Sequence, residues 1–438
     1  MIDIICQRAT LRTEGSNAYI IIFGKVKKLH SKSKTDFISK SYWGNGHSPL
    51  IKDFYNCTER NKSFPIDAYE EGKAVEEFLA IYRSSESGKK NIFETGWCEM
   101  SKTLKPRLYS AQCIRKIEKP VLTKDDIPYE ASLIFNAGVA KYKGKYVMVF
   151  RNDYGPTEKT YPKVKFKTSL GVATSDDGIN WQVKDKPIFD NKNLLPEDEI
   201  KRLYDPRITV IDGKPYLCMA MDTRHGVRGC IAEIDDSFEN IKIISASAPD
   251  NRNMVLFPEK VNGKYIRLER PFPVYSRGGK DRFDLWLSTS PDLNFWGETE
   301  LVLAVEDVPY ANDKIGPAAP PIKTDKGWLT IFHAVDKDNK RRKNGWERTW
   351  KKRYCAGIML LDLNDPTKIV GMSKLPLIAP ETYHETQSGF RKHVIFPGGM
   401  ILEDNGEVKI YYGASDTVEC LATARVEDLI ALCTESRK

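Results

Sequence analysis

The sequence predicts an all-β protein, a five-bladed β-propeller preceded by a partly helical N-terminal extension. Two observations predict this fold class. A segment that opens on a glycine turn and continues as a strand rich in Val, Ile, Tyr and Trp occurs five times. A second strand-like segment, ending in Asp, Asn or Ser, follows each copy. The uneven spacing of the copies is typical of propeller blades with loops of different lengths and argues against a solenoid.

Each copy of the first segment opens with a hairpin signal, Lys-Gly, Asp-Gly or Asn-Gly. The copies read KGKYVMVFRND, DGKPYLCMAMDTR, NGKYIRLERP, KGWLTIFHAVD and NGEVKIYYGASD, and they begin at Lys143, Asp212, Asn262, Lys326 and Asn405. We therefore expect the propeller to cover residues 115–438. Residues 1–114 lack the repeat and are expected to pack on the propeller or to join subunits of a homo-oligomer. Within them, residues 66–83 have apolar side chains at near-helical spacing and are predicted to form an amphipathic helix.

The composition is that of a folded globular protein, with 41% hydrophobic and 29% charged residues. The 68 basic and 60 acidic residues leave a net charge of +8 that is spread along the chain, so nucleic acid is not an expected partner. The densest basic segment, residues 340–354 (KRRKNGWERTWKKRY), interleaves two tryptophans with its cations. We interpret it as a solvated loop rather than as a surface on which nucleic-acid bases stack.

The nine cysteines contain no CxxC pair and no metal-ligand spacing, which predicts free thiols and no metal site. The N-terminal stretch MIDIICQRATLR has an acidic residue where a signal peptide has basic ones, and the longest apolar run near it is only YIIIF. This start argues against a signal peptide and against a membrane span. We therefore expect a cytoplasmic protein without a membrane partner and without a cofactor.

Polar side chains stand at the far ends of the five repeated strands. If equivalent strands occupy equivalent places in the blades, these ends meet at one end of the central channel and form a pocket. The side chains are Arg151 and Asp153, Asp222 and Arg224, Arg270, His333 and Asp416.

Further polar residues precede the repeated turns. Asp205 lies in RLYDPRIT, where an Asp-Pro step by itself is typical of a turn. Arg252 and Asn253 lie upstream of the third turn, and Lys314 lies upstream of the fourth. With the arginine and the histidine at the strand ends, one pocket would hold three cations, an imidazole and few acids.

A pocket of this composition suits a bound anion. A hydrolytic glycosidase usually needs two carboxylates, one to protonate the leaving oxygen and one to activate water or attack carbon. Two arginines and a lysine form a phosphate clamp, and a phosphate nucleophile needs one acid and no general base. Two alternatives stay open: a hydrolase that uses Asp153 or Asp416 as its second carboxylate, and a carbohydrate-binding propeller without chemistry.

Six segments, in order from about residue 135 to residue 417, resemble glycoside hydrolase family 130, the β-mannoside phosphorylases. They read FNAGVAKYKGKYVMVFR, LYDPRIT, NRNMVLFPEKVNGKYIRLERP, KIGPAAPPIKTDKGWLTIFHAVD, YCAGIMLLDLNDP and VIFPGGMILEDNGEVKIYYGASDT. The resemblance implies a five-bladed propeller that cleaves a β-mannosidic bond with inorganic phosphate and with inversion. The products would be α-mannose 1-phosphate and a shortened acceptor, so the enzyme would be a hexosyltransferase with phosphate as co-substrate.

The resemblance also implies roles for individual residues. Asp205 takes the place of the family's single proton donor, which relays its proton through the mannose 3-hydroxyl. Phosphate would be held by Arg252, Asn253, Arg270, Lys314 and His333. The mannosyl site would be lined by Asn136, Arg151, Tyr354 and Asp416. Family members that hydrolyse are described as lacking the phosphate-binding cations, so the cations of this chain favour phosphorolysis.

The chain departs from the family pattern in three places. His393 stands where the family usually has Asn before VVFP, the loop at residues 336–353 is longer and more basic than typical, and the N-terminal region is longer than in many members. These departures concern the acceptor side and the oligomer contacts. The expected linkage is β-1,4, and the alternatives are a β-1,2-mannoside phosphorylase and a β-mannoside hydrolase on the same fold.

Overall fold

The computed structural model describes strand residues between 2 and 30, residue 56, and residues 108–155, 166–273, 282–338 and 351–434. The chain divides into two compact units, Met1–Lys105 and Pro106–Lys438. The helix predicted at residues 66–83 lies outside the described residues, and so do residues 340–350 of the basic segment predicted at residues 340–354.

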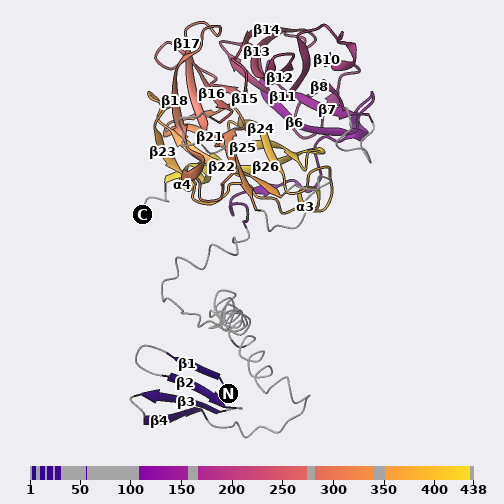
Figure 1. Ribbon diagram of the computed structural model, residues 1–438. Helices are drawn as coiled ribbons and strands as arrows, with labels where there is room; N and C mark the ends of the chain where they lie inside the picture. Colours follow the sequence, from indigo (N-terminus) through magenta and orange to yellow (C-terminus); the bar gives the residue numbers. More distant parts are fainter. Residues whose placement is uncertain are drawn as a thin grey trace. The chain divides into compact units, whose positions relative to one another are not determined.

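The first unit contains an antiparallel meander of four short strands (Figure 1). In sheet order they are β1 (Ile2–Ile5), β2 (Thr10–Glu14), β3 (Asn17–Ile22) and β4 (Lys25–His30). The sequence analysis did not predict this sheet, because its strands are short and are not copies of the repeated segment.

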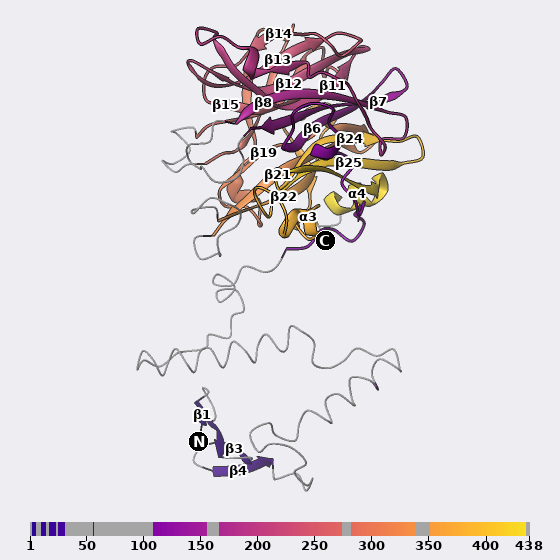
Figure 2. The same ribbon diagram turned by 90° about the vertical axis from the view of Figure 1, so that its right-hand side faces the viewer.

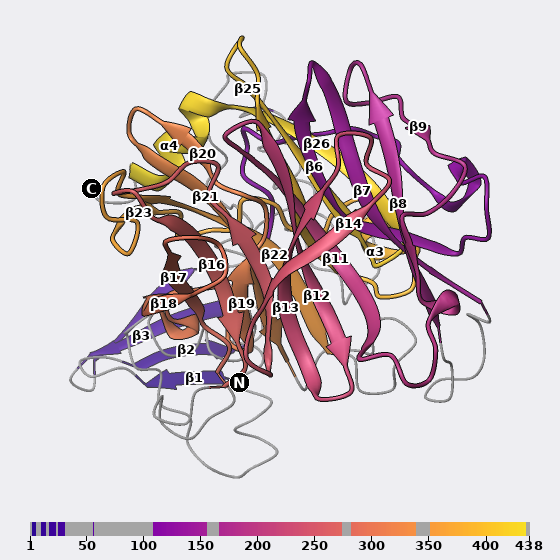
Figure 3. The same ribbon diagram turned by 90° about the horizontal axis from the view of Figure 1, so that it is seen from above.

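The second unit is a β-propeller of five antiparallel sheets, which confirms the predicted fold class (Figures 1 and 3). Blade 1 consists of β6 (Leu133–Tyr142), β7 (Lys145–Tyr154), β8 (Lys167–Ser175), β9 (Gln182–Val183) and β10 (Phe189–Asp190). Blade 2 consists of β11 (Ile200–Ile211), β12 (Lys214–Thr223), β13 (Gly226–Ile234) and β14 (Ile241–Ala246). Blade 3 consists of β15 (Asn251–Leu256), β16 (Tyr265–Pro271), β17 (Leu285–Ser290) and β18 (Gly297–Leu303).

Blade 4 consists of β19 (Lys314–Pro317), β20 (Ile322–Thr324), β21 (Gly327–Lys337), β22 (Lys352–Leu361) and β23 (Ile369–Met372). Blade 5 consists of β24 (Ile395–Leu402), β25 (Glu407–Ala414), β26 (Val418–Arg425) and β5 (Arg115–Lys116). Short 3-10 turns lie at Lys124–Asp126, Asn191–Asn193 and Val305–Asp307, and the described helices of this unit are α3 (Tyr383–Thr386) and α4 (Val426–Thr434).

The ring of blades closes between blade 5 and blade 1. The outermost strand of blade 5 is β5, which comes from the beginning of the unit and pairs with β26 near its end. A cluster of buried apolar side chains lies at each of the five junctions between neighbouring blades, including the junction between blades 5 and 1. Helix α4 packs on blades 4 and 5 (Figure 2). Apolar burial between the sheets therefore holds the ring together.

The glycine turns join the first and second strands of each blade. Three of them place two successive residues at positive φ, for example Asp212 at 50° and Gly213 at 75°. Positive φ at both central residues is the signature of the type I′ turn, whose twist matches that of an antiparallel pair. The hairpin signals of the sequence thus mark real hairpins, although the innermost strand before each turn was not part of the predicted unit.

The innermost strands of blades 1, 2 and 3 share a β-bulge at the same place. In each, the ladder skips two residues of the first strand against one of the second. The first bulged residue has a left-handed φ in all three: 55° at Asn136, 52° at Asp205 and 61° at Asn253. Asn and Asp are the side chains that tolerate this conformation best after glycine. The bulges therefore explain why these residue types stand at these positions.

The bulge also corrects the prediction that Asp205 lies in a turn. The Asp-Pro step lies in the middle of β11, and the strand continues on both sides of it. Pro206 fits there because the bulge removes it from the paired positions of the ladder, where its missing N–H would cost a hydrogen bond.

Two further features concern the described residues only. No described helix is both long and apolar enough to cross a membrane. The six cysteines of the described part are all free thiols, and five of them are buried.

Candidate active site

The polar residues singled out in the sequence meet at one end of the blades. The glycine turns lie at the opposite end, because each turn begins a second strand whose far end carries the polar side chains. Arg151, Arg270 and His333 stand near the far ends of β7, β16 and β21, and Asp416 follows β25. The first strand of each blade is antiparallel to the second, so it begins at this same end. The bulged residues and Lys314, the first residue of β19, therefore lie at this end as well.

Asp205 is held by groups from blade 1. Its Oδ1 accepts a hydrogen bond from Asn136 Nδ2 at 2.9 Å and another from Arg151 Nη1 at 3.0 Å. Among the described residues, both of its hydrogen bonds end on this one oxygen. The side chain keeps 14% of its surface exposed, whereas that of Asp153 keeps 4%. Asp205 is therefore the more accessible of the two acids beside Arg151.

The pKa of Asp205 is set by opposing influences. Burial alone would raise it, but Arg151, Arg207 and the amide of Asn136 lower it below its usual range. Without a ligand, the carboxyl is thus ionised at neutral pH. Arg207, two residues further along β11, was not predicted; it is buried, donates to the carbonyl of Pro206 at 2.8 Å and lies over the ring of Phe396.

Asp153 is occupied by structural contacts. It receives two hydrogen bonds from Arg151, a bidentate pair, and a third from Thr168 Oγ1 at 2.7 Å. Arg151 in turn lies between the rings of Phe135 and Tyr204, 4.5 and 5.1 Å from their centroids. This arrangement fixes the guanidinium that contacts Asp205.

Arg252 and Arg270 face each other directly across the ladder of β15 and β16. Like charges at opposed positions destabilise a sheet, and both side chains are largely buried. Nε of Arg252 and both Nε and Nη2 of Arg270 are buried without a hydrogen-bond partner among the described residues. Burial and the nearby Arg252 lower the pKa of Arg270 to about 9. Such a pair of guanidiniums is what a bound anion would compensate.

Lys314 completes the cluster from blade 4. Its Nζ and the guanidinium of Arg270 lie over the same ring, Phe283, at 5.0 and 5.1 Å from the centroid. Asp313, the nearest acid, is 3.8 Å from Nζ. Burial and the charges of Arg270, Lys352 and Arg252 lower the pKa of Lys314 to about 6. The three predicted cations are therefore close enough to repel one another.

His333 lies beneath this cluster and is completely buried. Its Nδ1 is 3.3 Å from the carbonyl of Pro317, and its Nε2 is 3.4 Å from Arg270 Nη1. A ring that donates from Nδ1 accepts at Nε2, so the histidine orients the arginine. Burial and the neighbouring cations hold the pKa of His333 well below its usual value, which makes it a neutral member of the predicted set.

Tyr354 and Asp416, which were predicted to line the mannosyl site, belong to blade 4 and blade 5: Tyr354 lies in β22 and Asp416 follows β25. Asp416 has a left-handed φ of 50° and receives a hydrogen bond from Arg391 Nη1 at 3.1 Å. Burial raises its pKa, while Arg391 and Arg151 act in the other direction. The ring of Tyr354 stacks on His333 with centroids 6.4 Å apart, and its backbone N–H donates to the carbonyl of His393 at 2.9 Å.

The departure at His393 has a conformational meaning. Its φ is 63°, in the region that Asn adopts far more readily than His. An asparagine there would fit the backbone without strain. The carbonyl of His393 makes its contact with Tyr354 whatever the side chain, so the replacement leaves this part of the site intact.

Sequence reasoning missed Tyr204, Arg207, Phe283 and Gly316. Tyr204 donates to Asp222 at 2.9 Å and lies 3.5 Å from Arg252 Nη1. A Cβ on Gly316 would lie 2.6 Å from Cε1 of His333 and 3.0 Å from Cδ of Arg270, so the glycine makes room for both. Tyr204 and Arg207 could have been found from the sequence, because they lie beside Asp205 in the motif YDPR. No local sequence pattern marks Phe283 or Gly316.

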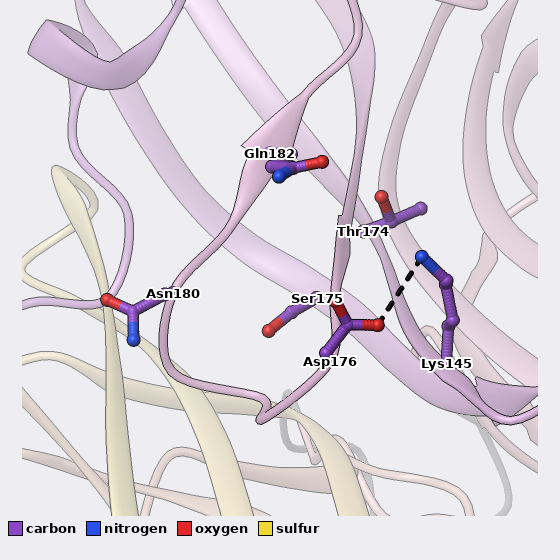
Figure 4. A pocket seen from close by; sticks show the side chains of 6 residues that line it. All are labelled: Lys145, Thr174, Ser175, Asp176, Asn180 and Gln182. Atoms are coloured by element: carbon purple, nitrogen blue, oxygen red, sulfur yellow. Dashed lines mark ion pairs between the residues drawn. The ribbon is translucent and has the colours of Figure 1, made fainter.

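A small pocket elsewhere in blade 1 is not part of this site (Figure 4). It is lined by Lys145, Thr174, Ser175, Asp176, Asn180 and Gln182, and Lys145 and Asp176 form an ion pair of 3.3 Å across it. Its volume of about 30 Å³ suits one water molecule. Lys145 begins β7, so the pocket lies at the glycine-turn end. No group of His, Cys, Asp and Glu that could hold a metal ion occurs in the described part of the chain.

The chain is similar to known proteins over its propeller unit. The family model of glycoside hydrolase family 130, described as β-1,4-mannooligosaccharide phosphorylase, matches residues 111–435. A 1,2-β-oligomannan phosphorylase of a Thermoanaerobacter species is 33% identical over 72% of this chain and 98% of its own length. A β-1,4-mannooligosaccharide phosphorylase of Ruminococcus albus is 31% identical over 71% of this chain and 88% of its own.

A solved structure is similar as well. The β-1,2-mannobiose phosphorylase of Listeria innocua, in complex with β-1,2-mannobiose, superimposes with a TM-score of 0.61 at 26% identity. The superposition covers 73% of this chain and 99% of that protein. With the family model matched across the whole propeller, the chain belongs to glycoside hydrolase family 130.

Proposed function

We propose that this protein is a glycoside phosphorylase that cleaves β-mannosides with inorganic phosphate and inverts the anomeric centre. The observation that carries the proposal is the cluster of three largely buried basic side chains, Arg252, Arg270 and Lys314. Nε of Arg252 and both Nε and Nη2 of Arg270 have no hydrogen-bond partner among the described residues. The family relatives named above are mannoside phosphorylases, which supports the same reaction.

Phosphate in this cluster would relieve the mutual repulsion of the cations. Each charge-assisted hydrogen bond to a guanidinium is stronger than a neutral one, and two arginines offer bidentate geometry. A phosphate oxygen positioned there would attack the anomeric carbon of the mannosyl group as the bond to the acceptor breaks. Positioning and electrostatic preorganisation would supply most of the rate.

Asp205 is the acid of the proposal. The reaction places one proton on the departing acceptor oxygen, and Asp205 would supply it directly or through a substrate hydroxyl. Its pKa is low in the ligand-free state because of Arg151 and Arg207. Arg252 interacts electrostatically with Asp205. A phosphate dianion bound at Arg252 would offset that charge, so its binding would raise the pKa of Asp205 and favour the protonated form.

The geometry disfavours a hydrolase that needs a second carboxylate. Asp153 accepts three hydrogen bonds from Arg151 and Thr168 and is almost wholly buried, so it is not placed to activate water. Asp416 is paired with Arg391 at 3.1 Å. A carbohydrate-binding propeller without chemistry would have no use for a buried cluster of three cations.

The linkage is a separate proposal. The sequence analysis favoured β-1,4, and the family model carries that linkage in its description. The names of two relatives at 33% identity, both from a Thermoanaerobacter species, favour β-1,2. We propose that the natural bond is one of these two, and that loops on the acceptor side select between them.

The reverse reaction tests activity and linkage together. Purified protein is supplied with α-mannose 1-phosphate and a panel of acceptors, mannose, glucose and short β-1,2- and β-1,4-mannooligosaccharides. We expect release of inorganic phosphate with one acceptor class, and analysis of the product gives the linkage. Phosphate release with none of the acceptors would contradict the proposal.

Asp205→Asn is the matched control for the acid. Asn tolerates the left-handed bulge and keeps the size of the side chain, so folding and phosphate binding should be preserved. We expect a loss of about 100- to 10,000-fold in kcat, the usual contribution of general acid catalysis. A variant that keeps wild-type turnover would exclude Asp205 as the acid.

A further inference from the structure

Glu419 is a buried acid behind the active site to which the mechanism above gives no role. It belongs to β26 in blade 5 and has no exposed surface. Its Oε2 accepts a hydrogen bond from the backbone N–H of Ala137 in blade 1 at 3.2 Å. The other oxygen, Oε1, has no hydrogen-bond partner among the described residues. Burial raises the pKa of Glu419 to about 8, so the carboxyl is mainly protonated at neutral pH.

The hydrogen bond serves the bulge of blade 1. The ladder of β6 and β7 skips from Phe135 to Gly138, and Ala137 is the second residue of the bulge. A bulged residue loses its ladder partner, so a buried N–H at this place needs another acceptor. The equivalent residue of blade 2 is Pro206, which has no N–H to satisfy. Blade 1 therefore requires an acceptor where blade 2 does not.

The first residue of the same bulge is Asn136, whose amide donates to Asp205 at 2.9 Å. The bulge has little room to move. A Cβ on Gly398 would lie 1.9 Å from the carbonyl oxygen of Ala137, and a Cβ on Gly413 would lie 2.5 Å from Asn136 Oδ1. A small displacement of the bulge would therefore move Asn136 and change its hydrogen bond to Asp205.

The closure of the ring holds Glu419 itself. Its backbone N–H donates to the carbonyl of Leu122 at 3.0 Å, and its carbonyl accepts from Val121 at 2.8 Å. Both partners come from the segment that follows β5, the closing strand of blade 5. A continuous set of contacts leads from the closed ring through Glu419 and Ala137 to Asn136 and the catalytic carboxyl.

We propose that Glu419 is a positioning residue for phosphorolysis, which holds the N–H of Ala137 and so fixes the bulge that aims Asn136 at Asp205. This inference deepens the proposed function and rests on it. Glu419 does not touch the substrate in this role; it acts through two residues of blade 1.

The test compares kcat and KM for four variants of the full-length protein. Glu419→Met removes the acceptor, and we expect kcat to fall by about tenfold or more while KM for phosphate stays within about twofold. Glu419→Gln keeps a carbonyl oxygen for Ala137 and should retain kcat within about threefold. In the background of Asn136→Ala, Glu419→Met should cost little further activity, because both act on one contact.

Glu403→Met is the matched control. Glu403 also joins blades 5 and 1, through Lys141 and Tyr146, but it lies at the glycine-turn end. We expect Glu403→Met to lower the melting temperature without changing kcat.

Two results would show that the inference is wrong. One is an unchanged kcat for Glu419→Met in an active protein. The other is a double variant whose loss of kcat, in free-energy terms, equals the sum of the losses caused by Glu419→Met and by Asn136→Ala alone. If Glu419→Met does not fold, Glu419→Gln decides, and a tenfold loss of its kcat would overturn the inference. A wild-type protein without turnover would instead refute the proposed function, and the inference with it.

Discussion

Arg270, a proposed phosphate ligand, is expected to destabilise the ligand-free fold. It is almost wholly buried and opposes Arg252 across the ladder, and two of its nitrogens have no hydrogen-bond partner in the part of the chain that the structure describes. An unpaired buried charge destabilises a protein unless a ligand compensates it. Stability at this position is therefore expected to depend on phosphate.

The first prediction concerns Arg270→Met. Without phosphate, removal of the buried charge should leave the free energy of unfolding unchanged or raise it by about 1 kcal/mol. In phosphate, the wild type should gain stability and the variant should not, because the gain follows ligand affinity. Thermal unfolding with and without phosphate measures both. Equal phosphate stabilisation of the two proteins would place the anion elsewhere.

The second prediction concerns the protonation of Lys314. Its pKa is about 6 in the ligand-free protein, against 10.5 for an ordinary lysine, so the amine is mainly neutral between these values. A bound anion raises the pKa, and the amine then takes up a proton as phosphate binds. At about pH 8 we expect binding to consume up to one proton, and below about pH 5, where Lys314 is already charged, we expect none from this residue.

Calorimetry in two buffers of different ionisation enthalpy measures this uptake. Lys314→Met should abolish the part of the uptake at about pH 8 that comes from the lysine, while phosphate binding becomes weaker. An uptake unchanged by this substitution would show that another group titrates.

At the level of elements, the bulges of β6, β11 and β15 define the site. They place Asn136, Asp205 and Asn253 at equivalent points of three successive blades, each in a left-handed conformation. All three residues were identified from the sequence, but the sequence did not show that a β-bulge is the reason why Asn or Asp stands at each of these positions. Turns and bulges favour the same residue types, Asn, Asp and Pro. The Asp205–Pro206 step is identified as a bulge only because the structure shows that β11 continues beyond Pro206.

The third prediction concerns the approach of β19 to β21 at Gly316. This residue pairs with His333, and a Cβ there would meet the imidazole at 2.6 Å and the stem of Arg270 at 3.0 Å. Gly316→Ala should therefore displace the arginine and raise KM for phosphate about tenfold or more, a shift of about 1.4 kcal/mol or more in binding free energy. Initial rates against phosphate concentration measure it.

The control for that substitution is Gly263→Ala, in the turn between β15 and β16, where a Cβ would meet nothing within 4 Å. Gly263 has a φ of 76°, so an alanine there is strained in its backbone. The substitution makes no contact with the residues of the proposed site. KM for phosphate should stay unchanged in this control. Equal KM values in all three proteins would mean that Gly316 does not set the position of Arg270.

At the scale of the whole molecule, the sequence predicted the five blades because each carries the same hairpin signal. The residues of the pocket could be placed at one end because equivalent strands run in equivalent directions. The pairing of Arg252 with Arg270, the low pKa of His333 and the contact of Glu419 with Ala137 could not be predicted, because they depend on register and on contacts between blades. The four-stranded sheet of the first unit was missed for lack of any repeat.

The ring also explains how residues far apart in sequence share one chemistry. Four blades contribute to the proposed site: blade 1 with Arg151, blade 2 with Asp205 at the bulge of β11, blade 3 with Arg270 and blade 4 with Lys314. The proposed anion site and the proposed acid thus come from different blades, and the apolar junctions between the blades set their separation.

The most direct test of the central claim is cleavage of β-1,2- and β-1,4-mannobiose with and without inorganic phosphate, followed by identification of the product. We predict that one of the two is cleaved at least about 100-fold faster with phosphate, and that the product is α-mannose 1-phosphate. Release of free mannose at the same rate in the absence of phosphate would contradict the account.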